Sequence, residues 1–224
     1  MRFRVMPSLV LACALAAEPA LAGVVGGTLW MNREALRTHE KTGAAASVAR
    51  QTGVTDAVVY IDDLPAKVDA KISANRRWFW QRRDTPYLPR IVQIDHKFVP
   101  RVMSVPVGTH TEFQNLDHVY HNVFSVSSAN RFDLGKYPPG RIDTVAFDKA
   151  GVVNLHCDIH PDELGYIVVT PNHAVARPDS LGHFKLPKLP PGTYTLHVFH
   201  PRRGEFERPV EVPKHGDVIL DLAF

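Results

Sequence analysis

Cysteine is scarce in this sequence, because the 224 residues contain only Cys13 and Cys157. Since Cys13 lies in an N-terminal stretch with the features of a removable signal, we expect the mature chain to keep Cys157 alone. One cysteine cannot form an internal disulfide, which excludes the disulfide-framework folds of many small exported proteins. Cys157 is therefore an inert buried thiol, a partner in an intermolecular bond, or a metal ligand.

Long apolar runs are also missing. After residue 22, no run approaches the ~18 residues that a membrane-spanning helix needs. Within residues 1–22, two arginines precede an apolar run and a small-residue site that ends at Ala22. This order predicts a secretory signal peptide cleaved before Gly23, and hence a periplasmic or secreted protein. The run is too short for an anchor, and Leu11 fits a lipoprotein cleavage box at Cys13 poorly.

No strong excess of one charge is present. The 26 basic and 23 acidic side chains give a formal net charge of +3, and 22% charged with 45% hydrophobic residues is an ordinary globular composition. This balance gives no indication of a nucleic-acid partner. A glycine-rich phosphate loop and a hydrolase-type serine elbow are absent from the sequence.

Segments typical of β-structure fill the chain. It has 18 prolines and 14 glycines, and short Val/Ile/Phe/Tyr runs lie between turn residues. The close spacing of these runs predicts an all-β fold with a sandwich at 57–61, 91–94, 101–107, 111–113, 122–126, 144–147, 152–155 and 166–170. In the tail, alternating apolar and polar residues predict strands with one buried face at 182–186, 189–198, 210–212 and 218–222.

Two segments differ from this pattern. Residues 32–51 include an alanine run and predict either a short helix or a mobile loop. Residues 76–83 interleave aromatic and basic side chains, and we interpret them as a long loop. Its aromatics either cap the sandwich, which we favour, or form a docking patch for an acidic partner or lipid headgroups.

Three residues in the middle of the chain predict the chemistry. His121 follows one predicted strand, and Cys157 with His160 lies in a tight turn between two others. A thiolate and two imidazoles, with one imidazole remote in sequence, suit a trigonal His-His-Cys copper site. Cys-x-x-His alone is a weak signal, and its position between two predicted strands strengthens it.

The segment 91–170 resembles the cupredoxins, most closely the amicyanin-like proteins often described as methylamine utilisation proteins. The resemblance implies a Greek-key sandwich that holds copper. Its shared features are the 98–108 strand, Phe113-x-Asn115, His121-Asn122-Val123, Phe147 before Gly151, and Cys157-x-x-His160-Pro161.

The resemblance also implies roles for individual residues. His121, Cys157 and His160 would be the equatorial copper ligands. Asn122 would join the two ligand loops by hydrogen bonding toward Asp158. These two residues and Pro161 would form the surroundings of the ligands.

The sequence departs from this family at the axial position. Where the resemblance implies a methionine, this chain has Glu163. Met103 shares its strand parity with Val105, which predicts a role in the core. Glu163 is therefore expected to be a carboxylate axial ligand, which would favour Cu(II) and lower the reduction potential. The alternative is that Glu163 faces solvent and three ligands remain.

The tail resembles the carboxypeptidase regulatory-like, or transthyretin-like, β-sandwich through the Gly-x-Phe-x-Leu and Leu-Pro-Pro-Gly-x-Tyr-x-Leu motifs within 182–196. The predicted organisation is a signal peptide at 1–22, an N-terminal β segment with the basic and aromatic loop at 23–90, the copper domain at 91–170 and a β segment at 171–224. The tail either packs with 23–70 as a discontinuous sandwich or forms a consecutive domain.

The predicted function is an exported copper protein that passes single electrons to a redox protein such as a cytochrome or dehydrogenase. Two other functions stay open at this point. One is a copper-binding or sensing module without a redox partner, and the other is a small-molecule redox enzyme with an open copper position.

Overall fold

The computed structural model describes residues 23–30, 54–80 and 88–223, with the backbone alone for 76–80. The predicted all-β class is confirmed, since four sheets and one α-helix make up the regular structure of these residues apart from a 3-10 turn, η1 (Val54–Asp56). The expected signal peptide and the 32–51 segment lie outside the described residues. Within the described part, none of the helices has the length and apolar character needed to cross a membrane.

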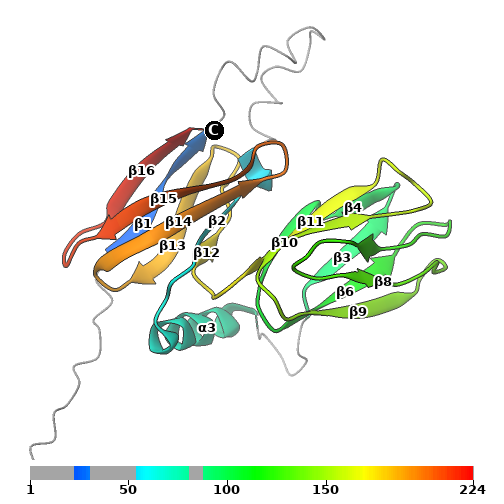
Figure 1. Cartoon of the computed structure of the whole chain (residues 1–224), viewed down its shortest axis with the longest axis horizontal. Coiled ribbons are helices and arrows are strands. Elements are labelled where there is room, and N and C mark those ends of the chain that lie inside the picture. Colours follow the sequence, from blue (N-terminus) through cyan, green and yellow to red (C-terminus); the bar gives the residue numbers. More distant parts are fainter. Residues whose placement is uncertain (1–22, 31–53, 81–87, 224) are drawn as a thin grey trace, which may run out of the picture.

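Strands β3 to β11 form two facing sheets, which we call the site sandwich (Figure 1). One sheet has the order β4-β3-β6-β9 and the other β5-β11-β10-β7-β8. Large apolar side chains from both sheets, including Phe113, Phe147 and Ile167, fill the space between them and are fully buried. The strands are β3 (Arg90–Ile94), β4 (Lys97–Val99), β5 (Val102–Pro106), β6 (Thr109–Asn115), β7 (Phe124–Ser125), β8 (Phe132–Asp133), β9 (Ile142–Phe147), β10 (Gly151–His156) and β11 (Leu164–Thr170).

The remaining strands form a second pair of sheets, the companion sandwich, with the orders β13-β1-β16 and β12-β2-β14-β15. The predicted alternation in the tail is confirmed, because β13 and β14 bury every second residue over most of their length. Strand β2 pairs with both β12 and β14, so strands from both ends of the chain share one sheet. The strands are β1 (Gly23–Trp30), β2 (Val58–Ile61), β12 (Val175–Ala176), β13 (His183–Leu189), β14 (Gly192–His200), β15 (Gly204–Val212) and β16 (Val218–Ala223).

Strand β2 is buried on both faces, which explains its continuous apolar sequence. Val59 and Ile61 belong to the core of the companion sandwich. Val58 and Tyr60 belong to a separate apolar cluster that includes Val102 and Val168 of the site sandwich. The two sandwiches are therefore in contact through apolar side chains.

The interpretation of residues 76–83 as a loop is wrong for 76–80, which form the end of helix α3 (Ala66–Trp80). The helix begins after Pro65, whose carbonyl accepts the N–H groups of Val68 and Asp69 at 2.8 and 3.1 Å. Val68 and Ile72, one turn apart, are buried in the companion core. Tertiary packing of this short apolar face stabilises the helix, and the aromatic and basic residues continue it.

Candidate metal centre

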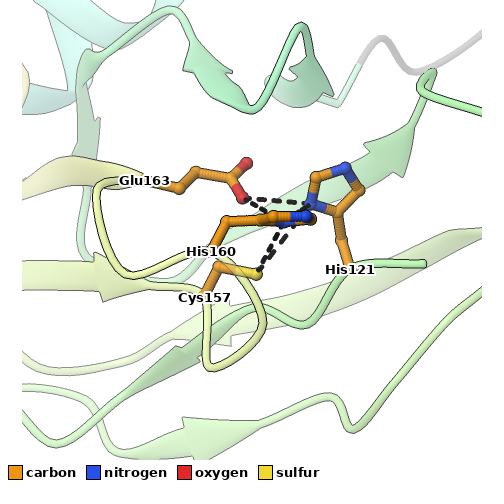
Figure 2. A group of neighbouring side chains, drawn as sticks. All are labelled: His121, Cys157, His160 and Glu163. Carbon is orange, nitrogen blue, oxygen red and sulfur yellow. Dashed lines mark hydrogen bonds and ion pairs between the residues drawn. The ribbon is translucent and has the colours of Figure 1, made fainter. Parts of the chain in front are cut away.

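Cys157, His160 and Glu163 lie on one short loop that joins β10 to β11. The pairing of His156 with Leu164 closes this loop at its base. Inside the loop, the N–H of Glu163 donates to the carbonyl of His160 at 3.0 Å. This turn brings the side chains of residues 157, 160 and 163 to the same side of the loop (Figure 2).

His121 reaches the loop from the segment between β6 and β7 and is fully buried. Its backbone exchanges two hydrogen bonds with Tyr137, at 3.2 and 2.8 Å. Its Nε2 lies 2.8 Å from the Oδ2 of Asp117. Its Nδ1 faces the second carboxylate, Glu163, so a metal ion bound at Nδ1 would leave the ring proton on Nε2, where Asp117 accepts it.

The four side chains direct their donor atoms to one point (Figure 2). The Nδ1 of His121 lies 3.2 Å from the Nδ1 of His160 and 3.0 Å from the Oε2 of Glu163. The Sγ of Cys157 lies 3.9 Å from the Nδ1 of His121 and 3.8 Å from the Nδ1 of His160. All four donor atoms lie within 4.8 Å of one another.

These separations fit a single metal ion. Bonds of about 2.0 Å to nitrogen and about 2.3 Å to sulfur imply donor atoms roughly 3.3 to 3.8 Å apart around one ion. The carboxylates of Asp117 and Glu163 place negative charge beside the imidazoles, and the two imidazoles direct their Nδ1 atoms at each other. A buried cation would compensate the carboxylate charge and the lone pairs, and the Asp117 to His121 pair is typical of a metal-bound histidine.

Glu163 is the least expected member of the group. Its side chain has 0% exposure, so the alternative in which it faces solvent is wrong. Its Oε1 accepts a hydrogen bond from the Nε2 of Gln93 at 2.8 Å, and Gln93 in turn accepts a hydrogen bond from the buried Tyr137 hydroxyl. Gln93 therefore satisfies one carboxylate oxygen and leaves Oε2 directed at the histidines.

Cys157 is a free and buried cysteine. Burial raises the pKa of its thiol, although backbone N–H groups of Asn122, His160 and Ile159 donate to the sulfur and act in the opposite direction. Those N–H groups would stabilise the thiolate form of Cys157 if a metal ion took the place of the proton. Such donors around sulfur are typical of a ligand site.

The predicted surroundings of the ligands differ from the structure. The side chain of Asn122 donates to the Oδ1 of Asp133 at 2.9 Å, and its own oxygen has no hydrogen-bond partner, so the expected link toward Asp158 is replaced. The two ligand loops are joined instead by the backbone N–H of Asn122 to Cys157. Asp158 and Pro161 are exposed.

The expectation for Met103 is confirmed, because this side chain packs against the core of the site sandwich. Sequence reasoning missed three residues around the site: Gln93, Asp117 and His96. A signal existed for Gln93, which shares strand parity with the buried Ile91. For Asp117 the signal was its position four residues before His121. No signal existed for His96, because only the folding of the chain brings it into contact with His160.

No known protein family and no curated protein match the chain. Solved structures resemble part of it. A copper-containing nitrite reductase from Thermus scotoductus SA-01 is 28% identical with a TM-score of 0.36, over 38% of this chain and 23% of that one. A purple cupredoxin from Nitrosopumilus maritimus is 23% identical with a TM-score of 0.34, over 37% of this chain and 99% of that one. A reduced amicyanin variant is 21% identical with a TM-score of 0.34, over 39% of this chain and 94% of that one. At these TM-scores the similarities do not assign the chain to a family.

Proposed function

We propose that this chain is a mononuclear copper protein that carries single electrons. His121, Cys157 and His160 would hold the ion as a trigonal set, with Glu163 as the fourth ligand. The observation that carries the proposal is the convergence of four donor atoms from these side chains within 4.8 Å. When bound, copper would supply a one-electron couple between Cu(I) and Cu(II).

The protein residues hold this arrangement rigid. Asp117 orients His121, Gln93 orients Glu163, and three backbone N–H groups surround the Cys157 sulfur. A ligand set that does not rearrange between oxidation states favours rapid electron exchange. As a ligand, the buried carboxylate would be an anionic donor, which would favour Cu(II) and lower the reduction potential relative to a thioether.

Spectra of the copper-loaded protein test the proposal. We expect an intense thiolate-to-copper band in the wild type, loss of that band in Cys157→Ser, and a bluer protein with a higher potential in Glu163→Met. Asp162→Asn is the matched control, since this exposed acid lies in the same loop and should leave the spectrum unchanged. Bound copper without a thiolate band in the wild type would contradict the proposal, and a preference for Zn²⁺ with no stable copper form would replace it with a structural zinc site.

The proposed partner is a one-electron redox protein such as a cytochrome or dehydrogenase, met in the periplasm or outside the cell, as the signal features of residues 1–22 favour. Reduction by a small cytochrome should be rapid, and azide should leave the copper spectrum unchanged because four protein donors fill the site. A spectral response to azide would favour an enzyme with an open copper position. Copper binding without exchange with the cytochrome would favour a sensing module.

We also propose that 91–170 is a domain inserted into a discontinuous one formed by 23–70 and 171–224. The pairing of β2 with β14, at Val59 with Val198 for example, supports this division. A chain with residues 91–170 replaced by a short glycine-rich linker should still fold as a β-protein. Failure of that chain to fold would favour a single cooperative unit.

A further inference from the structure

His96 covers the outer side of the metal centre. It is exposed, and its ring stacks on the ring of His160 with centroids 4.2 Å apart and an interplanar angle of 16°. His96 also lies 5.8 Å from His121, between ring centroids. The side chain of His160 itself is 23% exposed. A protein that approaches this face therefore meets His96 in contact with the ligand His160.

Histidine is an unusual residue for the turn that carries His96. Asp95 and His96 form the two-residue loop between β3 and β4, with φ angles of 52° and 55°. Such a loop corresponds to a type I′ turn, for which Asn-Gly is the favoured sequence. A histidine in the left-handed region is strained, where a glycine is not. Turn formation alone does not explain a histidine at position 96.

Asp117 fixes this turn and the metal centre together. Its Oδ1 accepts the N–H of Asp95 at 2.7 Å, and its Oδ2 accepts the N–H of His96 at 3.0 Å. The same Oδ2 lies 2.8 Å from the Nε2 of His121. One carboxylate thus holds the position of His96 relative to a ligand of the site.

We propose that His96 is the contact residue through which single electrons pass between the metal centre and a redox protein, which rests on the proposed copper function. In exchange between two copies of the chain, one electron leaves the reduced centre and enters the oxidised one, so that the first is oxidised and the second reduced. No bond or proton is transferred. The stacked ring of His96 provides an aromatic contact from His160 to the surface.

Electron self-exchange between the Cu(I) and Cu(II) forms tests this role without an unknown partner. His96→Gly and His96→Asn remove the ring, and both residues tolerate the left-handed backbone. We expect roughly tenfold slower self-exchange by NMR line broadening in both variants, equivalent to about 1.4 kcal/mol in activation free energy. His118→Gly is the matched control, because this exposed histidine precedes His121 in the same region and should exchange at the wild-type rate.

Measurements on the metal-free protein separate the contact role from a structural one. The urea midpoint of His96→Gly should equal or exceed that of the wild type, since the substitution relieves turn strain, and the NMR shifts of the His160 ring should move because the stacked neighbour is gone. Faster self-exchange in both variants would show that His96 is a shield, and an unchanged rate would show that electrons do not need it. Either result overturns the inference while leaving the copper proposal standing, whereas absence of the thiolate-to-copper band in the wild type defeats the copper proposal itself.

Discussion

The two sandwiches differ in what they bury. The core of the companion sandwich consists of apolar side chains. Of the ten buried polar side chains among the described residues, eight lie in the site sandwich and its loops: Gln93, Thr111, Asn115, His121, Asn122, Ser125, Glu163 and Thr170. Buried polar groups cost free energy unless they are paired, so the site sandwich depends on its hydrogen bonds and ion pairs more than the companion sandwich does. Its stability should depend on the metal, and that of the companion sandwich on packing.

Copper removal tests this contrast with the largest expected effect. Because only the folded site holds the four donor atoms, copper at 1,000 times its dissociation constant should stabilise the site sandwich by about 4 kcal/mol. Hydrogen exchange read by mass spectrometry should show greater protection of the peptides over 91–170 with copper than with chelator. Peptides over 183–212 serve as the internal control and should change little. Equal gains in both sandwiches would remove the contrast.

Packing in the two cores can be compared with a pair of matched substitutions. Leu196 in the companion core and Leu155 in the site sandwich are both fully buried. Each change to alanine should lower the free energy of unfolding by about 3 kcal/mol in the chelated protein. The copper spectrum should change only in Leu155→Ala, since Leu155 lies two residues before Cys157. A spectral change in Leu196→Ala would show that the companion sandwich shapes the site.

The polar network around Glu163 gives a third test. Gln93→Leu leaves the Tyr137 hydroxyl and the Oε1 of Glu163 without their partner and should cost about 2 kcal/mol. The copper electron paramagnetic spectrum should also change, because the carboxylate is no longer fixed. Gln114→Leu is the control on the neighbouring strand, where the glutamine only accepts from the exposed Arg90 at 3.0 Å. An unaltered spectrum in Gln93→Leu would mean that the loop alone positions Glu163.

The sequence predicted the parts of this molecule that depend on local pattern. Strand alternation located β13 and β14, and the spacing of Cys157 and His160 predicted two members of the candidate metal group. The buried carboxylate of Glu163 was also predicted, although only as one of two alternatives. The resemblance of 182–196 to the carboxypeptidase regulatory-like sandwich stays a prediction.

The parts that the sequence did not predict depend on contacts between distant residues. Gln93 reaches Glu163 across 70 positions of the chain. His96 reaches His160 because the β3–β4 turn folds over the ligand loop. Helix α3 was missed because Val68 and Ile72 form only a narrow apolar face, which becomes informative once it packs on the companion core.

The smallest expected effect is on stability at acid pH, which can be compared for one exposed carboxylate from each sandwich. In the site sandwich, the backbone N–H of Gly135 and the amide of Asn122 lower the pKa of Asp133. A lowered folded-state pKa means that the contribution to stability is fully present above the unfolded pKa of about 4 and is lost as the pH falls through the folded value. Since Asp133 is exposed, Asp133→Asn should remove less than about 1 kcal/mol of this pH-dependent stability in urea unfolding.

Asp179 of the companion sandwich is the control for Asp133, because the backbone N–H of His183 lowers its pKa in the same sense. Both variants to asparagine should therefore flatten the acid side of the stability curve. They should differ at the metal. Asp133 holds Asn122, the residue next to His121, so Asp133→Asn should shift the copper spectrum slightly, whereas Asp179→Asn should not. A spectrum that neither variant alters would limit the polar network of the site to Gln93, Asp117 and the ligand loop.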